Sequence, residues 1–496
     1  MRLLLAAGMA AALHAASIRG TVVENQTSRP VARTTVQLQP IAGTPGQTAA
    51  TRTNRFGVFE FNGVTAGTYI LKAARRGFLP VEYGQKRWDS AGLPFSVQAD
   101  EGLTLTIRLF RYGAISGAIT DENEVGLPDY GVVVYRAVQP PLLVASGRSD
   151  ERGLYRISGL EPGTYLVRSA AKQEDDQEYV PTFARETLRV EEARPVTVYP
   201  EDESRAADIH ALPGKLFSVA GMAITVPPSA PVKVTLVSDM GRQTVEGPVF
   251  RFTELPPGPY ELFAEVAENV NLNIRAQAAY LPLPVDRDNT GLRLPLQEVR
   301  DTRFIFEPEL RDLNAMQLLV RRKDLAGTAP AEPLTLNNGR AKLAPGRWEF
   351  SLRPPPGYYV SGFLASPMNP APAGRPDGWN ELFLQNFAGI RFSLSSGGGA
   401  LRGVVKSGGS PVAGAPVFVA AYDAVNRKWQ PDIRATRTDL RGAYQFRDLA
   451  PGTYRALATF EYLSPDSDAF DRAAVHSVEI GARQEAQLDP DLYVVP

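Results

Sequence analysis

The 496-residue chain contains no cysteine, which excludes disulfide frameworks, thiolate zinc sites and cysteine nucleophiles together. Histidine is scarce: behind the N-terminal segment only His210 and His476 remain, far apart in the sequence. Neither stands in a His-x-x-Glu or His-Glu-x-x-His motif, and a Gly-x-Ser-x-Gly elbow and a phosphate-binding Gly-x-x-x-x-Gly-Lys are missing. We therefore expect a protein that is not an enzyme, with no catalytic residues, no metal site and no cofactor.

An excess of charge of either sign is also missing, because 53 Lys and Arg face 54 Asp and Glu and leave a net charge of −1. Without a basic field to hold phosphate backbones, nucleic acid is not an expected partner. Acidic runs such as 121–124 and 466–471 fit no complete calcium loop, and we interpret them as turns. Hydrophobic residues make up 44% of the chain, which is enough to build several cores.

A hydrophobic run long enough to span a bilayer is missing too, since about 20 apolar residues are needed for that. The one marked run, Leu3 to Leu13, follows Met1-Arg2 and precedes small residues up to Ser17, which is the pattern of a secretory signal. We predict that residues 1–16 form a signal peptide that is removed. The mature chain should then have no membrane span and lie in the periplasm, at the cell surface or outside the cell.

An internal repeat runs through the rest of the chain. A Gly followed by an aromatic residue two positions later recurs at nearly even spacing, and an alternating strand pattern follows each copy. The five copies are Ala66-Gly67-Thr68-Tyr69, Pro162-Gly163-Thr164-Tyr165, Pro257-Gly258-Pro259-Tyr260, Pro345-Gly346-Arg347-Trp348 and Pro451-Gly452-Thr453-Tyr454. Pro-Gly suits the central positions of a type II turn, and the alternation places the aromatic ring on the core side.

Further strand signals flank each copy. In four of the five units a Gly opens the strand before the turn, and Asp-x-x-Gly at Asp150 and Asp439 indicates hairpin turns. The first strand of four units contains a Gly between apolar residues, which the fourth unit lacks at Phe304-Ile305-Phe306. Several short strands in each unit and no sustained helical period predict an all-β tandem array of about five small antiparallel β-sandwiches, transthyretin- or immunoglobulin-like.

The repeat sets the expected domain limits. They are a signal peptide at 1–16 and sandwiches at 17–111, 112–213, 214–299, 300–396 (divergent) and 397–496. Short connections between units predict a semi-rigid, extended string, in which Ser395 to Gly399 is the flexible hinge.

These residues resemble the bacterial carboxypeptidase regulatory-like repeat. The resemblance rests on the Gly-containing first strand, the Pro-led second strand, the Asp-x-x-Gly hairpin and the Leu-x-Pro-Gly-Thr-Tyr turn, and it is strongest over 115–167 and 401–454. It implies a transthyretin-like seven-stranded sandwich, related in shape to starch-binding-like modules. It does not imply peptidase activity. Such repeats resemble the spacer, surface-binding or pre-barrel parts of exported bacterial proteins.

Aromatic residues outside the repeated pattern are the candidate contact residues. Trp348 replaces the repeat Tyr and should belong to a core, whereas three other Trp fall between or beside the repeat strands. Exposed rings at such positions stack on sugar rings or anchor protein interfaces, or else they pack at domain junctions. The candidate contacts with carbohydrate or a partner are Trp429 with Tyr422 and Asp432, then Trp379, then Trp88 with Tyr83.

Two roles fit these features. The first is an exported, non-catalytic, multidomain protein that acts as a cell-envelope spacer, adhesion or protein-interaction module, with a cell-envelope protein as partner. The alternative is a carbohydrate-binding protein in which the loop aromatics stack on a polysaccharide.

Overall fold

Strands dominate the structure. The computed structural model describes residues 16–138, 141–174, 177–308, 315–366, 374–385 and 389–495, so the expected signal peptide lies almost wholly outside the described residues. Within these ranges the helical elements are one 3-10 turn, η1 (Val270–Leu272), and one short helix, α1 (Ser467–Arg472). No helix in this part of the chain is both long and apolar enough to cross a bilayer.

The first sandwich contains one smaller and one larger sheet, and the second contains two four-stranded sheets and a third, smaller one. In sandwich 1 the sheet orders are β4-β1-β8 and β3-β2-β5-β6, with β7 also on β5. Its strands are β1 (Ala16–Glu24), β2 (Thr35–Pro40), β3 (Ala49–Arg52), β4 (Val58–Val64), β5 (Gly67–Ala74), β6 (Val81–Glu82), β7 (Phe95–Val97) and β8 (Gly102–Leu109).

In sandwich 2 the sheet orders are β12-β9-β17, with β18 also on β9, then β11-β10-β13-β16, and a small β14-β15-β19. Its strands are β9 (Gly113–Thr120), β10 (Gly131–Arg136), β11 (Leu142–Arg148), β12 (Leu154–Leu160), β13 (Gly163–Ser169), β14 (Lys172–Glu174), β15 (Gln177–Val180), β16 (Val196–Val198), β17 (Glu203–Ser204), β18 (Ile209–His210) and β19 (Leu212–Pro213).

Sandwiches 3 and 4 keep the two-sheet plan. The orders are β23-β20-β26 with β22-β21-β24-β25-β27, and then β32-β28-β36-β34 with β30-β29-β33-β35, where β31 also pairs with β29. The strands of sandwich 3 are β20 (Phe217–Ile224), β21 (Lys233–Ser238), β22 (Gly241–Glu246), β23 (Val249–Leu255), β24 (Gly258–Val266), β25 (Gln277–Val285), β26 (Asn289–Pro295) and β27 (Gln297–Glu298). Those of sandwich 4 are β28 (Asp301–Glu307), β29 (Gln317–Asp324), β30 (Gly327–Thr328), β31 (Glu332–Pro333), β32 (Arg340–Lys342), β33 (Gly346–Arg353), β34 (Tyr358–Ser366), β35 (Asn380–Leu384) and β36 (Gly389–Ser396).

Sandwich 5 repeats the plan once more and adds α1. Its sheet orders are β43-β37-β46, β41-β40-β44-β45 with β42 also on β40, and a small β38-β39. Its strands are β37 (Gly399–Val404), β38 (Lys406–Ser407), β39 (Ser410–Pro411), β40 (Pro416–Asp423), β41 (Lys428–Trp429), β42 (Arg434–Arg437), β43 (Ala443–Leu449), β44 (Gly452–Ala458), β45 (Ser477–Ile480) and β46 (Glu485–Gln487). Most pairs are antiparallel, but the first strand of every unit also pairs in parallel with a late strand, as β1 does with β8.

Each sandwich encloses its own hydrophobic cluster, so the chain is a tandem array of five β-sandwiches. The clusters lie within residues 16–109, 115–211, 219–296, 304–394 and 401–486. The repeat aromatic faces the core as expected, and its polar atom donates to the carbonyl oxygen four residues earlier, at 2.5–2.9 Å. These bonds are Tyr69 to Thr65, Tyr165 to Glu161, Tyr260 to Pro256, Trp348 to Ala344 and Tyr454 to Ala450.

The glycine of the first strand has a packing reason. A Cβ added at Gly117 would lie 2.6 Å from the carbonyl oxygen of Ala207 and 2.9 Å from the Tyr155 hydroxyl. A Cβ added at Gly20, Gly221 or Gly403 would lie as close to a backbone carbonyl oxygen, or closer, at 2.6, 2.3 and 1.7 Å. An aromatic ring and a neighbouring backbone thus occupy the space that a side chain would need.

The turn predictions are right in part. Asp150 and Asp439 each accept two backbone N–H bonds, and the Gly that opens the next strand has a positive φ of 79° at Gly153 and 74° at Gly442. The type II turn at Pro-Gly is wrong. The left-handed residue lies four positions earlier, at Gly159 with φ 80° and at Asp448 with φ 55°, while Pro-Gly leads into the following strand.

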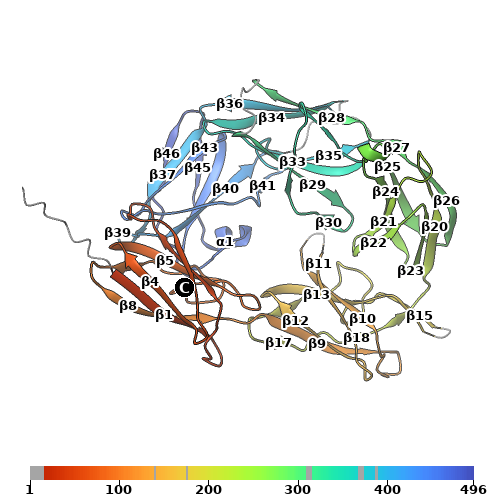
Figure 1. Ribbon diagram of the computed structural model, residues 1–496, viewed down its shortest axis with the longest axis horizontal. Coiled ribbons are helices and arrows are strands. Elements are labelled where there is room, and N and C mark those ends of the chain that lie inside the picture. The colour runs from red at the N-terminus through yellow and green to blue at the C-terminus, as the bar shows by residue number, and fades with distance from the viewer. Residues whose placement is uncertain are drawn as a thin grey trace, which may run out of the picture.

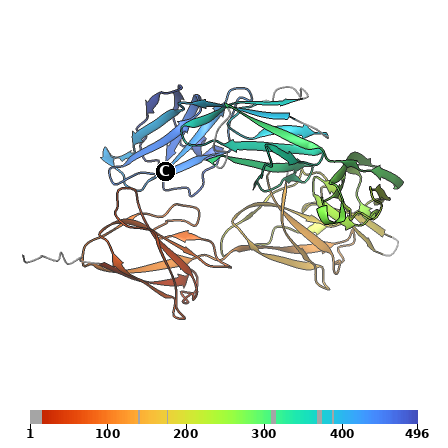
Figure 2. The same ribbon diagram turned by 45° about the horizontal axis from the view of Figure 1, so that its top comes forward.

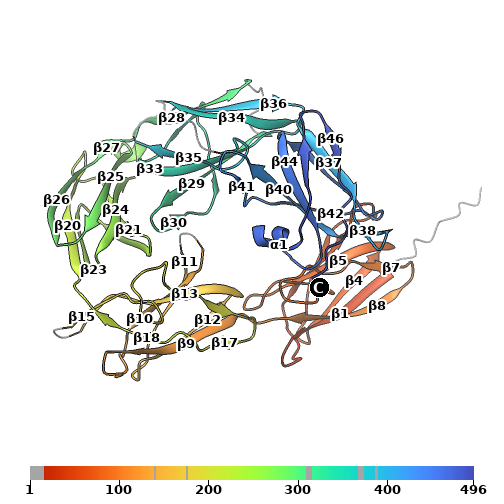
Figure 3. The ribbon, with the colours of Figure 1, turned by 180° about the vertical axis from the view of Figure 1, so that it is seen from behind.

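The expected extended string is wrong. Figure 1 shows the five sandwiches following one another around a ring, with sandwich 1 beside sandwich 5. In Figure 2 the first two sandwiches lie beneath the fifth and fourth, and the third is at one side. The view from behind in Figure 3 again places α1 and the end of β11 toward the interior of the ring. At the predicted hinge, the Gly397 N–H donates to the Gly357 carbonyl oxygen at 3.2 Å, and the Gly397 carbonyl oxygen accepts from the Arg483 N–H at 2.8 Å.

Candidate functional site between sandwiches 4 and 5

Two adjoining cavities separate the fourth and fifth sandwiches. Their volumes are about 620 and 880 Å³, and both are lined by Trp379, Gln430, Pro431 and Asp432. Sandwich 4 contributes the outer face of its larger sheet, and sandwich 5 contributes the connection between β40 and β42. Pockets that hold small ligands commonly measure about 300–1,000 Å³, so either cavity has a suitable size.

Trp379 is held in place by a cation. The Arg321 guanidinium lies 3.8 Å from the centroid of the indole ring, and its Nε donates to Glu349 at 2.6 Å. The next residue, Asn380, is buried and donates to the carbonyl oxygens of Pro376 and Gly378, which fixes the loop before β35. The indole is half-buried, with one face on Arg321.

Arg375 joins the two sandwiches. It forms two hydrogen bonds with Asp377, at 2.9 and 2.8 Å, and also donates to the Tyr454 hydroxyl at 2.8 Å and to the Tyr422 carbonyl oxygen at 3.4 Å. Burial lowers the pKa of Arg375, but Asp377 and Tyr454 outweigh this effect and bring the pKa above its ordinary value. Burial raises the pKa of Tyr454 to about 12, so the phenol stays protonated at neutral pH.

Asp432 is the charged residue that lines both cavities. Burial raises the pKa of its carboxyl group, Arg321 opposes that effect, and Glu349 adds to it. Among the described residues no hydrogen bond or ion pair involves the Asp432 side chain, although the neighbouring cations Arg321 and Lys323 each pair with a glutamate. Asp432 is exposed and lines both cavities, so its carboxylate oxygens can accept hydrogen bonds from a molecule bound there.

The other predicted contact residues lie elsewhere. Tyr422 and Trp429 are cross-strand partners with ring centroids 5.1 Å apart, and Arg455 lies 4.4 Å over the indole. Trp429 packs against a second cluster of sandwich 5 that contains Phe470 of α1, and it lines neither cavity. The structure thus brings Trp379 and Asp432 together and leaves the Tyr422–Trp429 pair beside them.

Tyr83 and Trp88 are not part of this junction. Tyr83 packs edge to face on Phe95, at 5.6 Å between centroids, and against the core of sandwich 1. Trp88 is half-buried in a loop whose neighbours contact sandwich 5: Arg87 donates to the Glu461 carbonyl oxygen at 3.0 Å, and Leu463 N–H donates to that of Asp89 at 2.7 Å.

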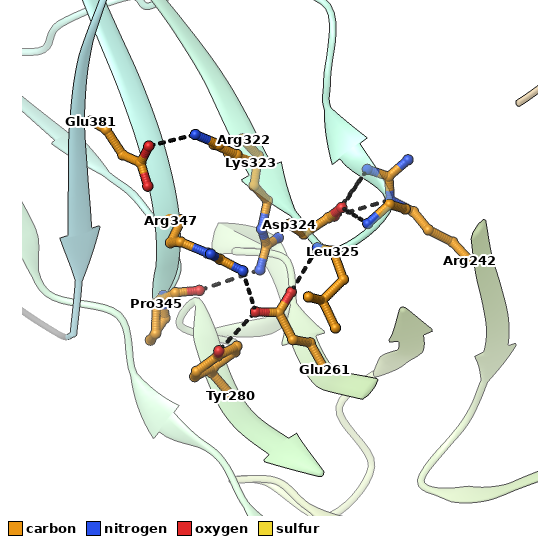
Figure 4. Close-up of polar contacts among 11 residues, drawn as sticks. Arg242, Glu261, Tyr280, Arg322, Lys323, Asp324, Leu325, Pro345, Arg347 and Glu381 are labelled. Atoms are coloured by element: carbon orange, nitrogen blue, oxygen red, sulfur yellow. Dashed lines mark hydrogen bonds and ion pairs between the residues drawn. The ribbon is translucent and has the colours of Figure 1, made fainter. Parts of the chain in front are cut away.

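A polar network that was not predicted joins sandwiches 3 and 4, as Figure 4 shows. The buried Glu261 carboxylate accepts from the Tyr280 hydroxyl at 2.9 Å, from Arg347 at 3.0 Å and from the Leu325 N–H at 3.0 Å. Beside it, Asp324 accepts three hydrogen bonds from Arg242 across the junction. One feature of the sequence pointed to this contact. On the outer face of β24 the apolar Phe263 stands between Glu261 and Glu265.

Metal-ligating side chains do not gather in the described ranges. These ranges contain no group of three or more His, Asp or Glu side chains placed to hold a metal ion. His210 pairs with Glu186 at 2.8 Å on the surface of sandwich 2, and His476 lies in sandwich 5.

Comparison with known proteins gives one family match, within the first unit. Residues 17–110 match the family model of the carboxypeptidase regulatory-like domain. A search of curated proteins finds no match. Solved structures that match include the Bacillus anthracis TIE protein, at 12% identity and a TM-score of 0.20 over 57% of this chain, and the chain spans about half (51%) of that protein. GBS52, the minor pilin of Streptococcus agalactiae, matches at 15% identity and a TM-score of 0.26, over 40% of this chain and 97% of the pilin.

Proposed function

We propose that this chain is an exported, non-catalytic protein that serves as a rigid spacer, adhesion or protein-interaction module of the cell envelope. The observation that carries the proposal is the way in which polar contacts join successive sandwiches. Glu261 and Arg375 are each satisfied by groups of two sandwiches, which fixes one sandwich relative to the next. Such an assembly presents several surfaces at fixed spacing, which is the property that a spacer or scaffold needs.

Export and the sandwich limits are parts of the same proposal. We place the mature N-terminus at Ser17 and the boundaries near residues 112, 214, 300 and 397. The mass of the mature protein tests the first statement, and limited proteolysis followed by mass analysis tests the second. Intact Met1 on a cytosolic form would contradict export, and early cleavage inside a core strand would contradict the boundaries.

The absence of catalysis has its own test. We expect no turnover of peptides with basic or apolar C-terminal residues, with or without added zinc. Activity that disappears with His210→Ala or His476→Ala would overturn this part of the proposal, because these are the histidines available to the mature chain.

A second role, carbohydrate binding, is favoured by the meeting of Trp379 and Asp432 at the same two cavities. The cations around Trp379, which are Arg321, Lys323 and Arg375, are already paired with carboxylates, so this part of the site suits a neutral polysaccharide better than an acidic one. The test is whether the protein is retained on insoluble polysaccharides. The variants Trp379→Ala and Asp432→Asn should no longer be retained. Trp429→Ala is a matched aromatic variant outside the cavities, and if it alone abolished retention, the site would lie on the Tyr422–Trp429 pair instead.

A further inference from the structure

The larger of the two cavities between sandwiches 4 and 5 contains cations of a different kind from those around Trp379. Three arginines line it: Arg353 at the end of β33, Arg434 at the start of β42 and Arg447 in β43. All three are exposed, and none forms an ion pair with a carboxylate within the part of the chain that the structure describes. The three cations around Trp379, by contrast, are each paired with a carboxylate.

These arginines bind neutral groups instead. Arg353 donates to the side-chain oxygen of Gln317 at 3.2 Å, and Arg447 donates through its Nε to that of Gln445 at 2.9 Å. Arg434 donates to the Arg447 carbonyl oxygen at 3.0 Å, which places the last two arginines side by side. Since a guanidinium has five N–H donors, most donors of each arginine remain available to a ligand.

The carboxylates of the same cavity do not cancel this positive charge. Asp377 is already bound by Arg375 through two hydrogen bonds. Asp432 and Asp448 line the cavity without an ion pair to any described residue. Three unpaired guanidinium groups thus stand against two unpaired carboxylates, and an anionic group of a ligand would meet an excess of positive charge.

The same cavity also offers ring surfaces. Tyr358 and Tyr359 line it and are half-buried, and so do the three consecutive prolines 354–356. Such rings pack against the C–H faces of sugar units, as an indole does. Because Trp379 lines both cavities, a polymer bound along them places one unit near Trp379 and a later unit near the arginines.

We propose that the larger cavity recognises the carboxylate of a uronic acid unit, so that the polysaccharide bound at this junction carries acidic units beside neutral ones. This inference rests on the second proposed role, carbohydrate binding, and names the class of polymer. The neutral unit stacks on Trp379, and the acidic unit lies at Arg353, Arg434 and Arg447. A guanidinium matches a planar carboxylate with two parallel N–H bonds, which the hydroxymethyl group of a neutral hexose cannot accept.

The test compares acidic polysaccharides with their carboxyl-reduced forms, in which each uronic acid unit becomes a neutral sugar of the same linkage. Hyaluronan, alginate and xanthan are immobilised on beads in both forms, and titration with the full-length chain gives an apparent dissociation constant for each. We expect at least one native polymer to bind about tenfold more tightly than its reduced form, since several exposed charge contacts add up. This preference should decrease in high salt, which screens exposed charges.

Substitutions identify the groups responsible. The triple variant Arg353→Gln, Arg434→Gln and Arg447→Gln should bind the native polymer no more tightly than the reduced one. Arg441→Gln removes an exposed arginine of the same sandwich that lines neither cavity, and it should leave both affinities unchanged. Trp379→Ala should weaken the binding of both forms. The three single variants, each with part of the loss, take the place of the triple variant if it fails to fold.

The outcomes separate this inference from the role on which it rests. Equal affinities for native and reduced polymers, or a triple variant that retains the preference, would overturn the inference and leave carbohydrate binding in place. Equally tight binding of dextran sulfate or polyglutamate would also overturn it, because that result indicates a general site for polyanions. If neither acidic nor neutral polymers were bound, carbohydrate binding itself would be contradicted, and the inference with it.

Discussion

The Arg437 guanidinium of sandwich 5 donates to the Glu82 carboxylate of sandwich 1 at 2.7 Å, although 355 residues separate the two in sequence. Lys72 lies 3.1 Å from the other oxygen of the same carboxylate, and Gly92 N–H donates to it at 2.8 Å. Two backbone bonds, from Ala91 to Phe460 and from Leu463 to Asp89, reinforce the contact. Sandwich 1 is therefore fixed at both ends, by its connection to sandwich 2 and by this closure.

We predict that Glu82→Ala weakens the closure. Truncating one partner of a buried, hydrogen-bonded charge pair commonly costs about 2–5 kcal/mol, because the other charge is left unpaired. Small-angle scattering should then show a larger radius of gyration than for the parent. Glu60→Ala, an exposed carboxylate on the same sandwich, is the control and should leave the radius unchanged. An unchanged radius in Glu82→Ala would mean that the backbone bonds suffice to keep the ring closed.

The glycine of the first strand gives a second prediction. Gly117→Ala should destabilise the protein by about 1–3 kcal/mol, because the new methyl group would press on the Ala207 carbonyl oxygen and the Tyr155 hydroxyl. The control is Gly258→Ala, where no atom lies within 4 Å of the added carbon. Urea denaturation of both variants provides the measurement. Equal denaturation midpoints for the two variants would show that the strand can move away from its neighbours to admit the methyl group without losing stability.

The repeat tyrosines provide a third prediction. Tyr69→Phe removes a hydroxyl whose main bond, at 2.7 Å, is to the Thr65 carbonyl oxygen, whereas Tyr454→Phe also removes the acceptor of Arg375. Net hydrogen bonds contribute about 0.5–1.5 kcal/mol and those to charged groups about 1.5–3 kcal/mol, so Tyr454→Phe should be the more destabilising. Thermal unfolding of the two variants compares them directly, and a larger loss for Tyr69→Phe would contradict the role of Arg375.

Local features were predictable from the sequence because they repeat. The alternation of apolar and polar residues correctly placed Tyr165 on the core side. The glycine of the first strand marked a position where a neighbouring backbone lies too close for a side chain, as it does at Gly117. Each feature depends on residues of one sandwich, and the copies provide independent observations of it, five for the aromatic residue and four for the glycine. The shared cavity of Trp379 and Asp432 was harder to predict. Both residues were candidate contacts, but nothing in the sequence indicated that they line the same cavity.

Ring closure could not be predicted, for a physical reason. Arg437 has counterparts at the same repeat position in Arg52 and Arg148, so the repeat does not distinguish it. Its pairing with Glu82 depends instead on small rotations accumulated over four junctions. The outer sheet faces gave a weak indication that they are covered. Phe263 stands between Glu261 and Glu265 on one such face, whereas a face exposed to water is expected to be polar throughout. That pattern indicates a covered face without indicating what covers it.

The last prediction concerns the junction of sandwiches 3 and 4 and its dependence on pH. Burial raises the pKa of Asp324 above its ordinary value of 3.8, although the Arg242 ion pair and the Ala326 N–H bond lower it. A carboxyl group whose pKa is higher in the folded state binds more protons there, so its contribution to stability falls as the pH rises from about 3.8 through the native pKa. Arg242→Ala removes the main opposing effect, and the pKa of Asp324 should therefore rise further. Carbon-13 titration of the Asp324 carboxyl group measures its pKa in the parent protein and in the Arg242→Ala variant. Arg251→Ala, on the opposite sheet of sandwich 3, is the control. A native pKa below 3.8 would show that the ion pair outweighs burial, and the junction would then gain stability as the pH rises.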